Sequence, residues 1–368
     1  MQATSRPHPT RREADIAEVA SPGSGRDVRR GLGCEGSRTE QRLLPAAVDE
    51  RKRHRMRLTK DPTPEKVLAG LQAQIERSGQ FASTIDPVAA LQTYDRLIRL
   101  LQPRLTELRR DVGLPADPPI FAAARARTSA RRRYSGMPVP SDRVFTYWNT
   151  PIDTAPPLVQ ACLANIRESY PALRVLDGRS VRELIDVPDR IAAVLEDSRP
   201  AHFSDYVRTR ILEEHGGVWF DATAWVGHNL DDDLQRRYLR AGTIFPRWTK
   251  LSIANWFIAS QKESVLLGLQ RRALDEWWTH FDDLPDYFLY HRIFEVLQVL
   301  VPEARGQWNA APVLSATSAH LLQMAMMQPW RPGTLTDIAA VAPLQKLSYK
   351  YGTVPDGSVL EHLIGPYV

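Results

Sequence analysis

The feature that most constrains the fold is a strand–helix–strand pattern near the middle of the chain. Residues 144–148 form a short β-rich run that ends at a turn signal, residues 149–151. Apolar residues at helical spacing follow as far as Tyr170, and a second β-rich run at 174–176 ends in Asp-Gly. Two strands joined by a helix form a βαβ unit, in which the strands are parallel. The pattern therefore predicts an α/β domain.

The N-terminal part of the chain has a different composition. Residues 1–55 are rich in Arg, Glu, Ser, Gly and Pro and contain few aliphatic residues. Such a segment buries too little apolar surface to offset the entropy that is lost on ordering, so we predict a disordered tail. Met56 begins a more regular stretch, and our hypothesis is that translation starts there.

Residues 56–115 are predicted to be helical. Their apolar residues recur at spacings of three, four and seven, which places them on one face of a helix. This face consists of Val88, Leu91, Ile98, Leu101, Leu105 and Leu108. Pro103 predicts a kink or a break within it. The simplest interpretation is a helical hairpin that packs on the main domain, and the alternative is a helix for dimerisation or for docking a partner.

Residues 116–140 are interpreted as a basic linker rich in Pro and Arg. The chain has a net charge of +5 and a pI of about 9.2, and part of the excess lies in this segment. Its clustered arginines are Arg125, Arg127, Arg131, Arg132 and Arg133. The simplest interpretation is a solvated linker, and the alternative is peripheral attraction to an anionic membrane surface or a polyanionic product. Nothing resembles a nucleic-acid-binding module, so no nucleic-acid partner is expected.

The cysteine content and the apolar runs bear on localisation. Cys34 and Cys162 are too few for a disulfide framework or a Cys-based zinc site. No apolar run approaches the ~20 residues of a membrane-spanning helix, and the N-terminus lacks the pattern of a secretory signal. We therefore expect a cytoplasmic protein with reduced thiols, or one at the membrane periphery through residues 116–140.

A helix with two charged residues on one face is predicted around residue 207. Its buried face would consist of Phe203, Val207 and Ile211, which are four apart. Asp205 and Arg208 are three apart on another face and can present their side chains together. Gly216 and Gly217 can end the helix. The alternative for Asp205 and Arg208 is a surface ion pair worth under ~1 kcal/mol.

An acidic residue follows the next predicted strand. Residues 218–220 form a short apolar run that places Asp221 at the carboxyl end of a strand. Ligands of open α/β sheets bind at this end of the strands, where an acid can hold a metal ion. The alternative is that Asp221 is an ordinary turn or helix-cap residue.

These residues carry a family resemblance. The runs S-D-Y-V-R (204–208) and G-G-V-W-F-D-A-T (216–223) together resemble the core motif of the capsular polysaccharide synthesis proteins. These are bacterial glycosyltransferases related to the DXD-containing sugar-binding transferases. Residues 286–291 resemble the family's aromatic-His element, and residues 345–350 resemble its C-terminal Lys-Leu-x-Tyr-Lys element. The resemblance spans residues 143–363.

The resemblance implies a GT-A-like transferase domain over residues 141–368, with a mixed, mainly parallel sheet flanked by helices. It also implies a nucleotide-sugar donor, a glycan or lipid-linked acceptor, and a divalent cation, Mn²⁺ or Mg²⁺. By matching position, Asp221 would be the catalytic residue, whose carboxylate belongs to the metal and sugar-diphosphate site. The donor would contact Ser204, Asp205, Arg208, Thr223 and Lys346. Thr223 stands where a full DXD motif has its second acid.

His291 is the second candidate metal ligand. Its ring nitrogen could complete the coordination shell of a metal ion held by Asp221, together with phosphate oxygens and water. The alternative is that it packs as an ordinary helical residue beside an apolar stripe, which consists of Tyr290, Phe294, Leu297 and Val301.

The function predicted from these residues is a metal-assisted glycosyltransferase, of hexosyltransferase type, in the assembly of surface or capsular polysaccharide. Two alternatives remain open. One is an inactive transferase fold that binds a glycan or a protein partner, with Thr223 marking lost chemistry. The other is a metal-dependent nucleotidyltransferase, which also holds phosphates on an α/β sheet.

Overall fold

The computed structural model describes residues 65–66, 68–69, 86–134, 137–138 and 140–368. All of them fall in one unit, Arg57–Val368. The predicted disordered tail and the predicted start at Met56 lie outside the described residues. Within the described part of the chain, no helix is both long enough and apolar enough to cross a bilayer.

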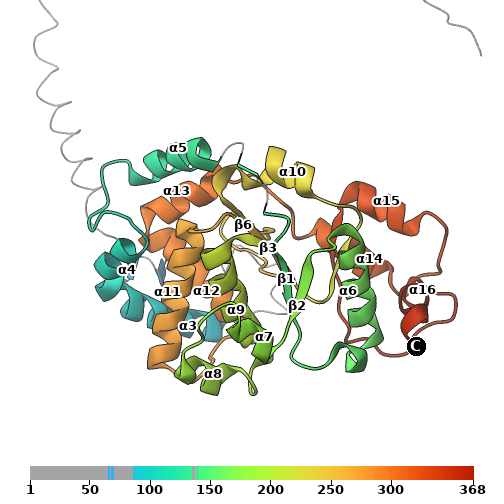
Figure 1. Cartoon of the computed structure of the whole chain (residues 1–368). Helices are drawn as coiled ribbons and strands as arrows, with labels where there is room; N and C mark the ends of the chain where they lie inside the picture. Colours follow the sequence, from blue (N-terminus) through green and yellow to red (C-terminus); the bar gives the residue numbers. More distant parts are fainter. Residues whose placement is uncertain (1–64, 67, 70–85, 135–136, 139) are drawn as a thin grey trace, which may run out of the picture. The chain divides into compact units, whose positions relative to one another are not determined.

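A five-stranded sheet forms the centre of the fold (Figure 1). Its order is β2 (Leu173–Leu176), β1 (Val144–Tyr147), β3 (Gly217–Phe220), β6 (Phe257–Ser260) and β5 (Thr243–Ile244). Strand β1 is parallel to β2 and β3, whereas β6 is antiparallel to β3 and β5. Helix α6 (Pro157–Ser169) joins β1 to β2. The predicted βαβ unit and the mixed α/β class are confirmed, and the more specific GT-A type stays a prediction.

Helices pack on the sheet and on one another. Helix α9 (Pro200–His215) contacts β1, β3 and β6, and α11 (Val265–His280) packs against α9. Helix α12 (Leu289–Leu300) contacts both α11 and α13 (Pro302–Ala310). The remaining helices are α3 (Pro87–Leu101), α4 (Leu105–Asp111), α5 (Ala122–Tyr134), α7 (Gly178–Arg182), α8 (Asp189–Leu195), α10 (Asp231–Arg236), α14 (Leu321–Ala325), α15 (Thr334–Val341) and α16 (Val359–Ile364).

The core lies between the sheet and these helices and contains large aromatic side chains. Trp219 and Phe220 of β3 are fully buried, as are Phe257 of β6 and Trp277 of α11. Strand β3 is buried along its whole length, as its uniformly apolar run predicts. Because β3 is packed on both faces, the residue at its carboxyl end has a fixed position.

The N-terminal helices pack on this core. Helices α3 and α4 are separated by a 3₁₀ turn, Gln102–Arg104, so the break predicted at Pro103 is confirmed. Helix α3 contacts α11 and α12 through the face that carries Leu97 and Leu101. Val88, predicted on the same face, is 62% exposed, because it lies in the first turn of α3 outside this contact.

Residues 116–140 differ from the expected linker, because residues 122–134 form α5. This helix packs closely against α13. Gly306 of α13 allows the close approach, since a Cβ atom there would lie 2.1 Å from the carbonyl oxygen of Ala123. Ala122, Ala130 and Tyr134 form the buried side of α5. The segment is therefore an ordered part of the domain, and its high Ala content suits a helix.

A separate two-stranded sheet brings the end of the chain beside β3. Strand β4 (Ala224–Val226) pairs antiparallel with β7 (Leu344–Lys346), and Ala224 lies opposite Lys346. A second apolar cluster supports this sheet from α6 and α16. Because β4 follows Asp221 by only three residues, the pairing places Lys346 next to the carboxyl end of β3.

The packing of α5 on α13 leads to a stability prediction. The substitution Gly306→Ala should lower the free energy of unfolding by about 1–3 kcal/mol, because the new methyl group meets backbone that has to shift. Chemical denaturation measures this change. Gly352→Ala is the matched control, because nothing lies within 4 Å of a Cβ atom at that position. Equal stability of the two variants would contradict the described packing.

Candidate functional site

Helix α9 contributes a buried arginine to the candidate site. The side chain of Arg208 is 5% exposed. It donates hydrogen bonds within its own helix turn, from Nη2 to the hydroxyl of Ser204 (2.9 Å) and from Nε to the carbonyl oxygen of Ser204 (3.1 Å). Nη2 also lies 3.4 Å from Oδ1 of Asp205. Asp205 and Arg208 thus lie together on this helix, as their spacing predicts, and Ser204 binds the same guanidinium.

Strand β3 delivers Asp221 to the same group. Helix α9 ends at His215 and is capped by Gly216, whose φ of 68° suits glycine, and β3 then runs to Phe220. The amide of Asp221 donates to the carbonyl oxygen of Trp256 (2.7 Å), which fixes the backbone at the strand end. Oδ1 of Asp221 lies 3.0 Å from Nη2 of Arg208 and accepts a hydrogen bond from the indole of Trp219 (3.3 Å). The Asp221 side chain is 24% exposed.

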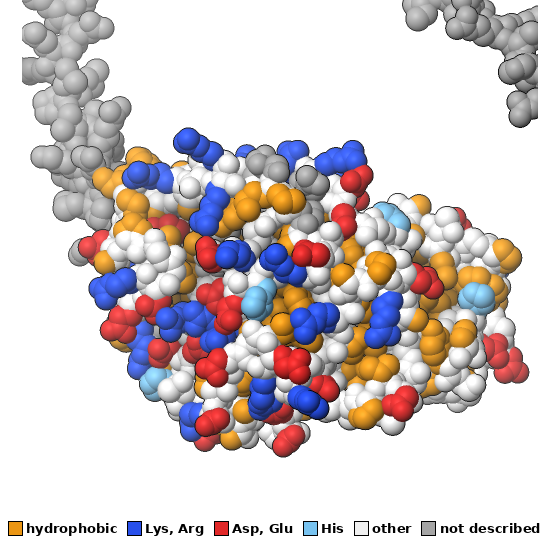
Figure 2. All heavy atoms as spheres, in the orientation of Figure 1, with side chains coloured by type: hydrophobic (Ala, Val, Ile, Leu, Met, Phe, Trp, Pro, Cys, Tyr) orange, Lys and Arg blue, Asp and Glu red, His pale blue; other side chains and the backbone are white. Residues whose placement is uncertain are grey.

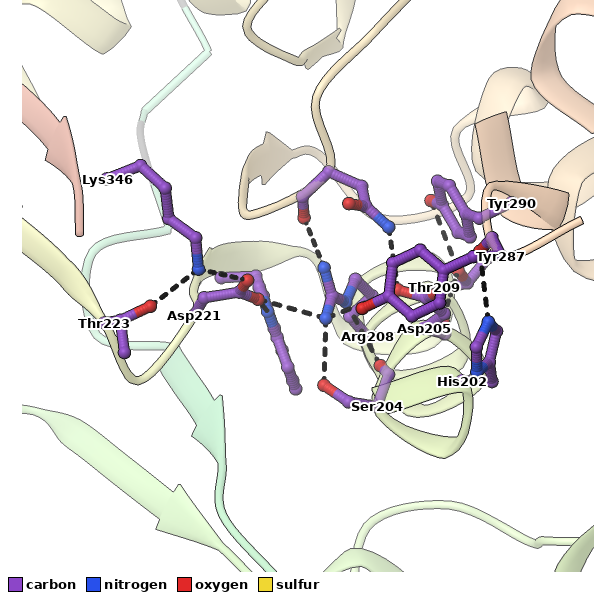
Figure 3. Close-up of polar contacts among 12 residues, drawn as sticks. His202, Ser204, Asp205, Arg208, Thr209, Asp221, Thr223, Tyr287, Tyr290 and Lys346 are labelled. Atoms are coloured by element: carbon purple, nitrogen blue, oxygen red, sulfur yellow. Dashed lines mark hydrogen bonds and ion pairs between the residues drawn. The ribbon is translucent and has the colours of Figure 1, made fainter. Parts of the chain in front are cut away.

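Strand β7 adds a second cation from the far end of the sequence (Figure 3). Nζ of Lys346 donates to Oδ2 of Asp221 (2.8 Å) and to the hydroxyl of Thr223 (2.7 Å). Asp221 therefore lies between two cations, with Arg208 at one oxygen and Lys346 at the other. We call the group Asp205, Arg208, Asp221, Thr223 and Lys346 the charged cluster.

Asn255 binds two residues of the charged cluster and was not predicted from the sequence. Its side-chain amide nitrogen donates to Oδ1 of Asp205 (2.7 Å), and its backbone carbonyl oxygen accepts from Nη1 of Arg208 (2.6 Å). Asn255 lies in the irregular segment before β6, where no local pattern marks it. Only the pairing of β6 with β3 brings this segment to the strand end.

The electrostatics of the two acids differ. Burial alone would raise the pKa of Asp221, but the charges of Arg208 and Lys346 outweigh it and lower the pKa to about 2. Burial raises the pKa of Asp205, and Arg208 only partly offsets that rise. Asp221 is therefore ionised throughout the physiological range, which keeps both cations in place.

Two aromatic groups lie at this end of the sheet. Tyr287 is 64% exposed, and its pKa is raised by partial burial and then by the charges of Asp205 and Asp221. Its carbonyl oxygen lies 3.1 Å from Nε2 of His202 (Figure 3). Trp148 follows β1 directly and stacks edge-on against Tyr349, with ring centroids 5.6 Å apart. Because β1 and β3 are parallel neighbours, Trp148 and Asp221, which follow them, lie at the same edge of the sheet.

His291 lies in the first turn of α12, beside the rings of Phe288 and Tyr290. Its Nδ1 is buried and has no hydrogen-bond partner among the described residues. Burial and then the charge of Arg292 lower the pKa of His291 to about 3, so its ring is neutral. No hydrogen bond in the described part of the chain joins His291 to Asp221. The stripe predicted beside His291 is buried, as its spacing requires (Tyr290, Phe294, Leu297 and Val301).

The residues at Asp221 do not fit a resident metal ion. Across the residues that the structure describes, no three His, Cys, Asp or Glu side chains lie close enough to hold one. Oδ1 of Asp221 is already ion-paired with Arg208, and Oδ2 accepts a hydrogen bond from Lys346. These two cations would compete with a metal ion for the carboxylate. Divalent-cation dependence therefore stays a prediction.

Arg247 is a buried basic residue that lies outside the charged cluster. Its guanidinium carbon lies 3.6 Å from the ring centroid of Trp308. It donates to the carbonyl oxygens of Trp308 (2.9 Å) and Ala311 (3.0 Å). Arg247 therefore supports the core near α13.

Comparison with known proteins identifies the family. The family model described as "Capsular polysaccharide synthesis protein" matches residues 127–363, which is more than half of the chain. A search of curated proteins found no match. The matched region contains every residue of the charged cluster, from Asp205 to Lys346. This chain belongs to the family of capsular polysaccharide synthesis proteins.

Proposed function

We propose that the protein is a glycosyltransferase that moves a sugar from a nucleotide-sugar donor to a glycan or lipid-linked acceptor in capsular polysaccharide synthesis. The observation that carries this proposal is the charged cluster at the carboxyl end of β3. Asp221 there joins a buried arginine to a partly exposed lysine. Family membership supports the polysaccharide context.

The cluster suits a diphosphate leaving group. As the bond between the sugar and the diphosphate breaks, its electron pair moves to a phosphate oxygen and adds negative charge there. A cation about 4 Å from that oxygen stabilises each unit of charge by roughly 4 kcal/mol at an effective dielectric of ~20. Lys346 is 23% exposed and can contact such a group, and the buried Arg208 adds a second charge behind it.

Asp205 and the aromatic residues suit the rest of the donor. Asp205 is 16% exposed, and its carboxylate can accept hydrogen bonds from sugar hydroxyls. Arg208 and Asn255 hold this carboxylate in one orientation. The Trp148–Tyr349 pair is partly exposed at the same edge and offers ring faces to a base or a sugar.

A donor-hydrolysis experiment tests the proposal. Purified protein is incubated with UDP-, GDP-, ADP-, CDP- and dTDP-sugars, and the products are separated by anion-exchange chromatography. We expect slow formation of free sugar and one nucleoside diphosphate, with water as the acceptor. Asp221→Asn should lower this rate about 100-fold, because it releases Lys346 and weakens the hold on Arg208.

The control variant for this experiment is Asp153→Asn, which changes an exposed acid. It should hydrolyse the donor at the rate of the unsubstituted protein. Release of pyrophosphate would instead indicate a nucleotidyltransferase. Absence of both products and of nucleotide binding would indicate an inactive binding fold. A fully active Asp221→Asn variant would remove Asp221 from the reaction.

We also propose that α5 holds the protein at an anionic membrane surface, where a lipid-linked acceptor would be found. The five arginines of α5 are exposed, and none has an ion pair with a described residue. Ile120 and Phe121, which precede the helix, are 48% and 72% exposed. Several Lys and Arg side chains gather along the edge that carries α5 (Figure 2). Exposed cations beside exposed apolar side chains suit a lipid interface.

Vesicle co-sedimentation tests this surface. The protein should bind phosphatidylcholine vesicles that contain phosphatidylglycerol and should not bind pure phosphatidylcholine. Replacing three arginines of α5 with glutamine should weaken binding about 100-fold, since each contributes about 1 kcal/mol near an anionic surface. The substitutions are Arg125→Gln, Arg127→Gln and Arg131→Gln.

The matched control replaces three exposed arginines outside α5 with glutamine, namely Arg99, Arg174 and Arg331. It lowers the net charge equally and should keep most of the binding. Equal losses in the two triple variants would contradict a role of α5, as would equal binding to neutral vesicles.

A further inference from the structure

One ammonium group is held by both polar side chains of the D-A-T sequence. Nζ of Lys346 lies 2.8 Å from Oδ2 of Asp221 and 2.7 Å from Oγ1 of Thr223. Figure 3 shows Asp221 and Thr223 pointing toward this one atom. Asp221 and Thr223 occupy the first and third positions of the motif, where a pair of acids would share a cation. Here the shared cation is a side chain of the protein.

The backbone fixes this ammonium in place. Lys346 lies opposite Ala224 in the β4–β7 pair, and the amide of Leu347 donates to the carbonyl oxygen of Thr223 (2.9 Å). The preceding residue, Gln345, is 2% exposed. Its side-chain amide nitrogen donates to the backbone carbonyl oxygens of Ser318 and Ala342. The lysine therefore extends from a short strand that is anchored on both sides.

The identity of the third residue suits an ammonium better than a metal ion. The threonine hydroxyl is a neutral acceptor, so the pair Asp221 and Thr223 carries one negative charge, which matches the single charge of Lys346. The other oxygen of Asp221 is 3.0 Å from Arg208. A second acid in place of Thr223 would leave an excess of negative charge, which is what a divalent ion requires.

We propose that the ammonium of Lys346 replaces the divalent cation of the donor site. This inference rests on the proposed glycosyltransferase function. In the transfer, the bond between the anomeric carbon and the phosphate oxygen breaks, and the electron pair stays on the diphosphate beside Lys346. The acceptor oxygen forms the new bond to the anomeric carbon and loses its proton to water. Diphosphate binding and donor turnover then require no metal ion.

Three measurements on the full chain test the proposal. The first is calorimetric binding of UDP, GDP, ADP, CDP and dTDP, each with EDTA and with Mn²⁺. The second is donor hydrolysis under the same two conditions. The third is the Mn²⁺ EPR signal in the presence of protein without nucleotide. We expect affinity and rate to agree within about twofold between EDTA and Mn²⁺, and the EPR signal to remain that of free Mn²⁺.

Substitutions test whether Lys346 is the cation that binds the diphosphate. Lys346→Gln should weaken diphosphate binding at least about tenfold with EDTA, because it removes a charge-assisted hydrogen bond. Lys346→Arg should keep part of the affinity, since the positive charge remains. Lys350→Gln is the matched control, because Lys350 is an exposed lysine of the same C-terminal segment. Thermal unfolding of each variant checks that it is folded.

The outcomes separate this inference from the proposed function. Binding and hydrolysis that occur only with Mn²⁺ and disappear with EDTA would overturn the inference and leave the transferase function intact. The same holds if Lys346→Gln binds diphosphate as tightly as Lys350→Gln. Failure of every nucleotide and donor under both conditions would overturn the proposed function and the inference together.

Discussion

The buried guanidinium of Arg208 is the interaction on which the site depends. Its charge offsets two acids that come from different elements, Asp205 of α9 and Asp221 at the end of β3. A charge that is 5% exposed is stable only when paired and hydrogen-bonded, and Arg208 has both kinds of partner. Helix α9 and strand β3 are therefore held together electrostatically at the edge where the reaction is proposed.

The topology explains why distant parts of the sequence meet at this edge. Strands β1 and β3 are parallel neighbours, so the residues that follow them lie at the same end of the sheet. Strand β6 runs antiparallel to β3, so its first residue lies at the carboxyl end of β3. The segment before β6, which contains Asn255, therefore lies at that end too. The β4–β7 pair then adds Lys346 from near the C-terminus. The charged cluster and Asn255 thus come from four segments of the chain.

The sequence predicted the local parts of this arrangement well. The apolar run of β3 and the spacing in α9 place Asp205, Arg208 and Asp221 correctly, because both depend on local periodicity. Lys346 was predicted only through the family resemblance, since no local pattern links it to Asp221. The roles of these four residues in binding and catalysis stay predictions.

Other features were beyond sequence reasoning because they depend on tertiary contacts. The basic segment at 122–134 forms a helix on α13, where Gly306 permits the close approach. Its many arginines suggested a linker, because charge in a sequence does not reveal which residues face a neighbouring helix. Arg247 is buried against Trp308, a contact that no sequence pattern signals.

A crystal structure with a bound nucleoside diphosphate tests the central claim most directly. The account predicts a phosphate oxygen within hydrogen-bonding distance of Nζ of Lys346, with Asp221 still between Lys346 and Arg208 and with Asp205 facing the sugar side. A diphosphate bound away from the carboxyl end of β3, with the charged cluster untouched, would contradict it.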